Sequence, residues 1–533
     1  MRKTSDFKLT LLGIVPQLKD ETVSLDPQSI SALSALMTFK GKSIQQLKED
    51  SLAKDKPFDE QIYRILLNSS LKGHASIATT PVLSFTYEAS KFIDSALTGL
   101  PFASALMHSG RRADITPDDT VLPSSIGADR DMEALYVSES EKLIVFFNEL
   151  LASGLPKDYA SKILPYGNYG TGTITLSLES LLAVKREYQI EKDWMPEEVG
   201  LLLREIETKL KEMGVDLAYF TRFVSPASMY PYPNIFKNPT PTNLAREYKK
   251  SVGDGHTKVV TYTIENNEAL KQALHTVDLK LREIAGSKER LAEEWFEVLL
   301  ERQRIIRDFN SAVSLQILST VSWRVWGDKK RHRTVPMVVD SMYHAIARAC
   351  EVFFRHQTEI QSGTISTETI ESLDSVFAIP ERIRTQEELV VKWVQHASSA
   401  LRCYSELTKH GVKPSDAIFI IPRGIRIDVL QEYNMHNLIS GYFPLRLCTT
   451  AEEQLQKLSL REAAEIKKIL TENNLPELAS LIRPKCQTLG FCPEKKNCAV
   501  ITQFNPDYTE EWHSYIHSQL EEKFKHELDS LNV

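Results

Sequence analysis

The chain has 533 residues, too many for one ordinary hydrophobic core, and its 42% hydrophobic and 25% charged residues are typical of a globular protein with at least two domains. Its net charge of −7 argues against a dedicated nucleic-acid-binding protein, which needs a basic surface to displace the counterions of phosphate groups. It contains no apolar run long enough to span a bilayer or to serve as a signal peptide. We therefore expect a cytoplasmic protein without nucleic-acid or membrane partners.

The first half of the chain begins with an alternating strand pattern over residues 7–15, followed by a helical pattern over residues 29–39. Two polar strings come next: Gly-His-Ala-Ser at residues 73–76 and Ser-Gly-Arg-Arg at residues 109–112. A lone histidine is more often structural than functional, and the second string is also consistent with a polar turn before Pro117. The glycine-rich segment at residues 167–172 has the wrong order for a dinucleotide fingerprint and predicts a turn. A helical pattern over residues 196–213 follows.

A proline-rich connector separates the two halves. Prolines this dense break both helices and strands. The sequence therefore predicts a domain over residues 1–225, a connector over 226–256, a second domain over 257–505 and a helical tail over 506–533. The connector prolines are Pro226, Pro231, Pro233, Pro239 and Pro241.

The second half starts in the same way as the first. A strand pattern over residues 258–264 precedes helical patterns over residues 268–284, 288–307 and 458–470. Each half therefore combines a short sheet with several long helices, which predicts an α+β fold used twice and suggests a duplication.

The most informative string is Arg331-His332-Arg333, with Ser341 after seven further residues. Two guanidinium groups beside an imidazole form a compact anion site, because arginine binds phosphate in a bidentate manner and keeps its charge. The alternative is a solvated basic turn at the C-terminal end of a helix, where cations are favourable.

The cysteines are confined to the second half. They are not distributed like a secreted disulfide framework. Three of them, at residues 486, 492 and 498, are one ligand short of a closed zinc site that Cys448 or a histidine could complete, and free buried thiols are the alternative. We predict no metal site. The six cysteines are Cys350, Cys403, Cys448, Cys486, Cys492 and Cys498.

The spacing Arg-His-Arg-x7-Ser resembles the signature of flavin-dependent thymidylate synthases. The strings at residues 73–76 and 109–112 are similar to the Gly-His-x-Ser and Ser-x-Arg-Tyr motifs of that family. The segment over residues 160–165 looks like its Leu-Pro strand, and the segment over residues 404–422 looks like its helix, glycine turn and Leu-Pro strand. The resemblance implies a catalytic set of Arg331, His332, Arg333 and Ser341. It implies flavin or folate contacts by His74, Ser76, Arg331, His332, Arg333 and Asn434. It implies nucleotide contacts by Ser109, Arg111, Ser341 and Arg446.

The motifs are divided between the halves. Ten residues before Ser109 the first half has Gly99 in place of the first arginine of the triplet, and the second half has no Gly-His-x-Ser string at the corresponding place. Family sites lie at subunit interfaces of a homotetramer, so a fused pair of copies can complete one kind of site from both halves. We expect such a composite site, and a homodimer that forms a pseudo-tetramer.

The activity that the resemblance implies is reductive methylation of dUMP to dTMP, with methylenetetrahydrofolate as carbon donor and NADPH as hydride donor through FAD. Ile418 and Ser161 replace an arginine of the family's nucleotide site, with Lys162 as a neighbouring positive charge. These replacements favour two alternatives: a flavoprotein with altered pyrimidine chemistry, or a nucleotide-binding scaffold without thymidylate synthase activity. A nucleic-acid module built on residues 329–333 is a third alternative, which the overall acidity disfavours.

Overall fold

The computed structural model describes the chain except for residues 20–23, 55, 72–75, 109–113, 222–232, 240–243, 253–256, 266 and 532–533. The described residues form two compact units that are interleaved along the sequence. Unit 1 consists of Met1–Pro241, Ser322–Arg333 and Val339–Ile427. Unit 2 consists of Thr242–Val321, Thr334–Val338 and Asp428–Val533.

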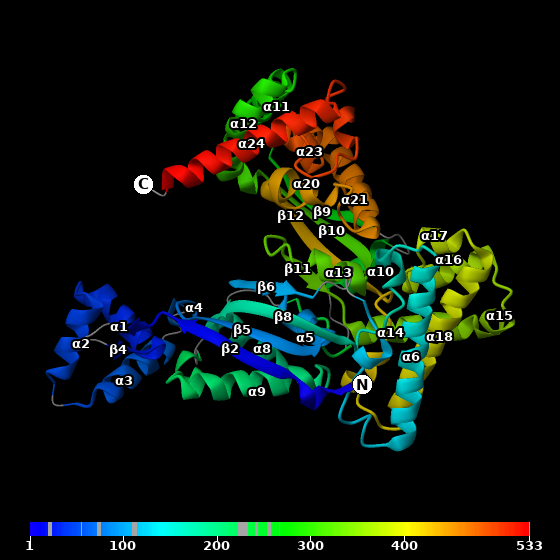
Figure 1. Ribbon diagram of the computed structural model, residues 1–533, viewed down its shortest axis with the longest axis horizontal. Coiled ribbons are helices and arrows are strands. Elements are labelled where there is room, and N and C mark those ends of the chain that lie inside the picture. Colours follow the sequence, from blue (N-terminus) through cyan, green and yellow to red (C-terminus); the bar gives the residue numbers. More distant parts are fainter. Residues whose placement is uncertain are drawn as a thin grey trace. The chain divides into compact units, whose positions relative to one another are not determined.

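Unit 1 contains a four-stranded sheet in the order β2-β5-β8-β6, in which all neighbours are antiparallel. Alternate residues of β5, from Leu83 to Ala89, are buried because successive side chains of a strand point to opposite faces. Helices α8 and α9 pack against this sheet (Figure 1). The strands are β2 (Lys8–Val15), β5 (Val82–Ser90), β6 (Ala103–Met107) and β8 (Tyr169–Ser177), with the short strands β1 (Arg2–Lys3), β3 (Leu18–Lys19), β4 (Ser24–Leu25) and β7 (Val121–Leu122).

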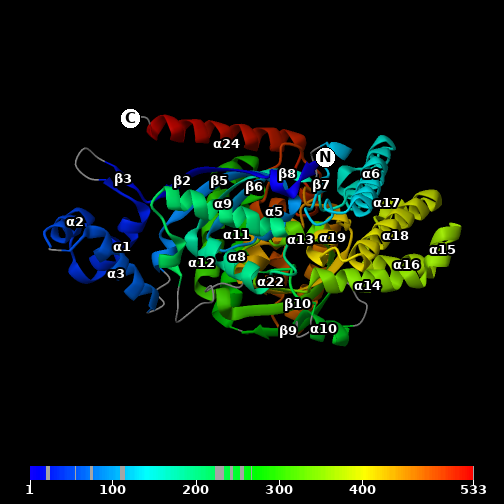
Figure 2. The same ribbon diagram turned by 90° about the horizontal axis from the view of Figure 1, so that it is seen from below.

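The helices of unit 1 include two long ones, α6 and α18, which lie side by side in both views (Figure 1 and Figure 2). Local signals start and stop the helices: Asp26 caps α1 through a 2.8 Å bond from the Ser29 amide, and Gly41 ends it with a φ of 63°. From the first half come α1 (Pro27–Lys40), α2 (Ile44–Leu52), α3 (Phe58–Leu71), α4 (Ser76–Thr79), α5 (Lys91–Leu97), α6 (Arg130–Ala152), α7 (Lys157–Ala160), α8 (Leu178–Ile190) and α9 (Glu197–Glu212). From the second half come α13 (Trp323–Lys329), α14 (Met342–Arg355), α15 (Gln357–Ser362), α16 (Thr367–Val376), α17 (Glu381–Arg384), α18 (Glu387–Lys409) and α19 (Pro414–Ala417).

Unit 2 is organised around a sheet in the order β11-β12-β10-β9 and a hydrophobic core that its helices share with this sheet. The strands are β9 (Thr257–Ile264), β10 (Val313–Ser322), β11 (Met337–Val339) and β12 (Arg426–Asn434). The helices are α10 (Leu244–Val252), α11 (Glu268–Ile284), α12 (Lys288–Phe309), α20 (Phe443–Arg446), α21 (Glu453–Glu472), α22 (Pro476–Leu481), α23 (Lys485–Leu489) and α24 (Glu510–Leu531). No helix in the described part of the chain is both long and apolar enough to cross a membrane.

The two halves repeat one order of elements. Helix α6 and helix α18 both have 23 residues, and their first residues are 257 positions apart, at 130 and 387. The same offset relates α7 to α19, and β8 to β12. The strand orders β2-β5-β8-β6 and β9-β10-β12-β11 also correspond. A serine at the strand end caps the following helix in each half, Ser90 for α5 and Ser322 for α13. The halves therefore share a topology.

Most elements predicted from periodicity are confirmed, including the strands that begin each half and the helices over residues 29–39, 196–213, 268–284, 288–307 and 458–470. The Leu-Pro strand prediction is wrong in both halves. Residues 160–165 lie at the end of α7 and in the turns after it, and Ile418–Ile420 form a 3-10 helix after α19. Pro156 is the N-cap residue of α7, and Lys413 is the N-cap residue of α19. A short apolar run suits a strand and a buried helical turn equally, so the pattern alone does not show that a helix begins at these residues.

Two further predictions need correction. Residues 244–252 of the proposed connector form α10, because the prolines end at residue 241 and an amphipathic helical sequence follows. The glycine-rich segment at residues 167–172 is not only a turn, since Tyr169 begins the nine-residue strand β8. The strand contains glycines because the side chains of Lys91 and Tyr87 lie so close to Gly170 and Gly172 that no Cβ atom fits there.

Candidate functional site

Corresponding segments of the two halves pair with each other inside unit 1. The amide of Tyr166 donates to the carbonyl of Ile421 at 3.0 Å, and the amide of Arg423 donates to the carbonyl of Leu164 at 3.0 Å. Tyr166 and Arg423 are 257 positions apart, as are Leu164 and Ile421, so each half gives the other the same bond. Such an exchange is the mark of an isologous, twofold-like interface. The two halves of the chain thus meet through equivalent segments.

Glycines at equivalent positions permit this close approach. A Cβ atom on Gly167 would lie 2.6 Å from the carbonyl oxygen of Phe419, and one on Gly424 would lie 3.1 Å from the carbonyl oxygen of Lys162. Phe419 and Lys162 are themselves equivalent residues of the two halves. Lys162, the lysine beside the replaced arginine position, is buried, and its ammonium group lies 2.9 Å from the carbonyl oxygen of Asp158.

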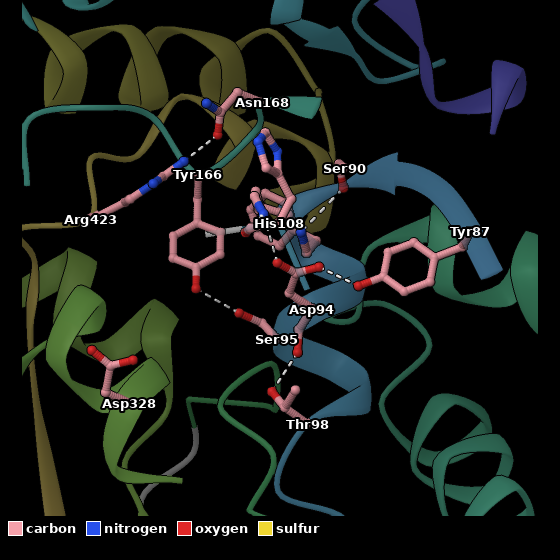
Figure 3. A network of polar contacts seen from close by, with 12 residues as sticks. Tyr87, Ser90, Asp94, Ser95, Thr98, His108, Tyr166, Asn168, Asp328 and Arg423 are labelled. Atoms are coloured by element: carbon pink, nitrogen blue, oxygen red, sulfur yellow. Dashed lines mark hydrogen bonds and ion pairs between the residues drawn. The ribbon is translucent and has the colours of Figure 1, made fainter. Parts of the chain in front are cut away.

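Aromatic rings and a buried arginine fill the space beside the pairing. The rings of Tyr166 and Trp323 stack with centroids 3.9 Å apart, and those of Phe92 and Phe419 stack at 4.3 Å. Arg423 lies over Tyr166 and donates to the side-chain oxygen of Asn168 (Figure 3). Burial lowers the pKa of Arg423 to about 10, so the guanidinium group stays charged at neutral pH.

A buried ionic network lies at the start of α5. The ammonium group of Lys91 donates to a carboxylate oxygen of Asp94 at 3.0 Å and to the carbonyl oxygen of His108 at 2.5 Å. The hydroxyl of Tyr87 donates to the other oxygen of Asp94 (Figure 3). Burial lowers the pKa of Lys91, and Asp94 opposes this shift. Burial, followed by the charge on Lys91, also lowers the pKa of His108.

Two glycines of strand β8 leave room for the side chains of this network. A Cβ atom on Gly172 would lie 2.5 Å from the hydroxyl oxygen of Tyr87, and one on Gly170 would lie 2.8 Å from the Cε atom of Lys91. A side chain at either position would displace a member of the network, because both contacts are shorter than van der Waals contact. The glycine-rich string is therefore part of the site's construction.

Lys330, which directly precedes the basic triplet, joins this network from the second half. The triplet follows α13, which ends at Lys329. Its backbone is therefore the basic turn at a helix end that the sequence offered as an alternative. Lys330 is buried and donates to the carbonyl oxygens of Ser95 at 2.7 Å and Asp94 at 3.3 Å, at the end of α5. Its ammonium group also lies 4.4 Å from the ring centroid of Trp326. Lys330 thus ties the start of the triplet to a helix of the first half.

Arg331 faces outward but acts on first-half residues. Its side chain is 57% exposed, and its guanidinium group lies 4.0 Å from a carboxylate oxygen of Asp328. Its positive charge lowers the pKa of Tyr87, although burial first and Asp94 second raise that pKa well above its ordinary value. The charge of Arg331 also lowers the pKa of Lys91. The triplet of one half therefore contributes to the electrostatics of the other half.

The two other triplet residues differ in accessibility. His332 is half-buried, and its amide donates to the carbonyl oxygen of Lys329 at 3.0 Å. Arg333 is exposed. Two exposed guanidinium groups two residues apart can bind an anionic group that reaches the surface of unit 1.

Ser341 is the N-cap residue of α14 and is buried. Its hydroxyl donates to the carbonyl oxygen of Lys237 at 2.6 Å, and its amide donates to Asp340 at 2.9 Å. The other carboxylate oxygen of Asp340 accepts a 2.7 Å contact from a ring nitrogen of His344. The structure thus gives Ser341 a positioned hydroxyl at the start of a helix, and its predicted nucleotide contact stays a prediction.

The remaining predicted residues fall in two groups. Asn434 and Arg446 belong to unit 2: Asn434 ends β12 and its side-chain oxygen accepts two bonds from Asn437, while Arg446 is the half-buried last residue of α20. His74, Ser109 and Arg111 lie outside the described residues, and Ser76 is described only as the first backbone position of α4. A common pocket for His74 and Arg331 therefore stays a prediction.

The cysteines form no disulfide, and all six are free. Burial raises the pKa of Cys403 to about 12 and that of Cys486 to about 12. Within the described ranges, no three histidine, cysteine, aspartate or glutamate side chains are arranged to hold a metal ion.

Sequence reasoning missed four members of the site: Lys91, Asp94, Tyr166 and Arg423. None belongs to a recognisable motif, because each acquires its partners only when distant segments pair. One signal was available for Arg423, which directly follows the Ile-Ile-Pro ending that was matched to the family. Another was the pair of glycines at residues 170 and 172, which indicate close side-chain approach if the segment is a strand.

Comparison with known families agrees with the two-fold repeat of this fold. The family model described as thymidylate synthase complementing protein matches residues 18–210 and 258–471, which together make up more than half of the chain. The chain belongs to this family, and the model matches it once in each half.

Relatives of known function are similar over a shorter stretch. The flavin-dependent thymidylate synthase of Pyrococcus abyssi (strain GE5 / Orsay) is 32% identical over 126 residues, which is 24% of this chain and 51% of that protein. The enzyme of the same name from Pyrococcus furiosus is 30% identical over 125 residues, 24% of this chain and 50% of that protein. The chain thus spans about half the length of the curated relatives it matches. Among solved structures, the UMP/dUMP methylase PolB from Streptomyces cacaoi matches with a TM-score of 0.33 and 13% identity, over 43% of this chain and 98% of that one.

Proposed function

We propose that the chain is a flavin-dependent thymidylate synthase made of two fused copies of one family unit. It carries out the reductive methylation of dUMP to dTMP with methylenetetrahydrofolate and NADPH, through FAD, at a site that both halves complete. The observation that carries this proposal is the position of the triplet: Lys330 is bonded to the end of α5, and the charge of Arg331 acts on Tyr87 and Lys91. Family membership supports the chemistry.

The side chains of the triplet are chemically suited to bind a flavin nucleotide. Arg331 and Arg333 are exposed cations, and only Arg331 has a carboxylate, Asp328, at 4.0 Å among the described residues. Their planar donors suit the diphosphate or the carbonyl-bearing ring edge of FAD. When bound, FAD supplies the hydride-transfer chemistry that no protein side chain can provide. Arg331, His332 and Arg333 would hold it, with His74 and Ser76 of the first half as further proposed contacts. The resemblance to the family also assigns a flavin contact to Asn434.

The chain's own groups bind, orient and polarise in this proposal. Lys330 fixes the backbone from which Arg331 projects, so the guanidinium group is placed before a ligand arrives. Ser341 is the proposed nucleotide contact from the start of α14, with Ser109 and Arg111. The resemblance to the family also assigns a nucleotide contact to Arg446. Positive charge near the uracil oxygens draws electron density from the pyrimidine ring and replaces activation by a thiolate.

We infer that two chains assemble into a homodimer equivalent to a tetramer of single copies. The exchange of bonds between Tyr166, Ile421, Arg423 and Leu164 supports this, since one dimer-like interface is already present within the chain. The small-molecule partners are dUMP and the folate.

One alternative is a nucleotide-binding scaffold that has lost the activity. It is favoured by the internal position of Lys162 and by the hydroxyl of Ser341, which already donates to a backbone carbonyl. A scaffold predicts a colourless purified protein, whereas the proposed enzyme retains flavin and forms dTMP.

The test combines a spectrum with turnover. The purified full chain should show flavin absorbance and convert dUMP to dTMP with methylenetetrahydrofolate and NADPH. Arg331→Ala should weaken flavin binding by roughly 10- to 100-fold, since losing a charged hydrogen bond costs about 1.5–3 kcal/mol. Arg355→Ala removes a 61% exposed arginine of the same unit and should change nothing. His74→Ala should resemble Arg331→Ala if the site is shared.

Two results would contradict the proposal. A colourless protein without turnover would remove the assigned activity. If Arg331→Ala and Arg355→Ala bound flavin equally well, the triplet would not be part of the flavin site, even if the protein binds flavin.

A further inference from the structure

A cavity of about 450 Å³ lies between α1 and α3 of unit 1, away from the network described above. Three of its lining residues are cations, Lys54, Lys56 and Arg64, and one is a carboxylate, Glu60. Arg64 is bonded to Glu60 at 3.1 Å, so these two charges offset each other. In the described part of the chain neither lysine is paired with a carboxylate. The described lining residues therefore carry an excess of positive charge.

The segment that carries the two lysines is bonded to α3. Gln61 donates to the carbonyl oxygens of Ser51 at 2.8 Å and Lys56 at 2.9 Å, and its side-chain oxygen accepts a 3.3 Å bond from Lys54. One glutamine of α3 thus fastens the segment that follows α2. Leu36 and Ile65 supply an apolar wall. An apolar wall with cations along its rim suits an extended ligand whose far end carries several negative charges.

The position of the cavity along the chain relates it to the proposed folate site. Arg64 and Asn68, one turn apart on α3, both line the cavity, and α3 ends at Leu71. The proposed folate-binding motif at residues 73–76 follows directly in the sequence. From Arg64 to Leu71 the helix rises by about 10 Å, which is within the reach of an extended co-substrate.

We propose that this cavity binds the oligo-γ-glutamyl tail of the folate co-substrate. The inference rests on the proposed function, since it assumes that a folate binds at the site. A volume of about 450 Å³ is larger than a single phosphate group requires, and cations on two segments suit successive carboxylates along a tail. The 2′-phosphate of NADPH is the competing occupant.

The test compares folates that differ only in the tail. Pteroylpentaglutamate and folic acid, which has one glutamyl residue, are titrated calorimetrically into the full chain saturated with FAD. The pentaglutamate should bind roughly tenfold more tightly, and salt should reduce the difference because the cations are exposed. Lys54→Ala/Lys56→Ala should abolish the preference. Lys54→Glu/Lys56→Glu should reverse it. Lys192→Ala/Lys211→Ala, which changes two exposed lysines outside the cavity, should retain it.

The outcomes separate this inference from the proposed function. Binding is measured without turnover, so a protein that makes no dTMP but prefers the pentaglutamate through Lys54 and Lys56 supports the cavity and contradicts only the activity. A protein that makes dTMP but binds both folates equally overturns the cavity assignment. The assignment is also overturned if the lysine substitutions leave the folate preference intact and instead abolish the preference for NADPH over NADH.

Discussion

Glu198 gives a quantitative prediction about the stability of unit 1. This residue lies in the first turn of α9 and is 1% exposed. One carboxylate oxygen accepts the amide of Ser90 at 2.9 Å, and the other accepts the hydroxyl of Ser90, the residue that caps α5. Burial raises the pKa of Glu198 from 4.5 to about 7, although the bonds from Ser90 oppose the shift. The folded protein therefore binds a proton at this site that the unfolded chain releases near pH 4.5.

The sign of the effect follows from proton linkage. A raised carboxyl pKa contributes stability that is fully present below pH 4.5 and is lost as the pH rises through about 7. A shift of this size corresponds to roughly 3 kcal/mol of unfolding free energy, at about 1.36 kcal/mol per pKa unit. Glu198→Gln mimics the protonated acid and cannot titrate. The substitution should therefore stabilise the protein at pH 8 relative to the natural chain by roughly 3 kcal/mol more than it does at pH 4.5.

The assay is urea unfolding of the full chain at pH 4.5, 6 and 8, followed by tryptophan fluorescence. Glu197→Gln, an exposed neighbour on the same helix, is the matched control and should show no pH-dependent difference from the natural protein. The reasoning fails if the difference between Glu198→Gln and the natural chain is the same at all three pH values.

Two further predictions concern the link between the triplet and α5. Lys330→Met should lower the free energy of unfolding by about 1–3 kcal/mol, because the carbonyl oxygens of Asp94 and Ser95 lose this donor, and it should also weaken flavin binding. An unchanged urea midpoint would contradict the first effect. Gly99→Ala should destabilise more than Gly154→Ala. Both glycines have positive φ, 83° and 86°, which costs about 1–2 kcal/mol for alanine, but only a Cβ on Gly99 meets a neighbour, the carbonyl oxygen of Lys330 at 3.0 Å. Equal melting temperatures of these two variants would contradict the prediction, because they would show that the carbonyl group of Lys330 moves aside without cost.

The candidate site was only partly predictable. Arg331, His332, Arg333 and Ser341 could be proposed from the sequence because their chemistry and spacing lie within a short string. Lys91 could not be found in this way, since its role depends on a carboxylate three residues away, on a carbonyl 17 residues away, and on the glycines that make room for it.

The amino-acid sequence alone determined the elements whose periodicity is local: the strands that open each half, the long amphipathic helices, and the repetition of this order along the chain. Tertiary structure alone decided that α13 to α19 of the second half belong to unit 1, and that Pro165 and Pro422 meet in an antiparallel bridge. The physical reason is the range of the interactions. Side-chain periodicity acts over a few residues, whereas the pairing of Tyr166 with Ile421 joins backbone groups that no local pattern connects.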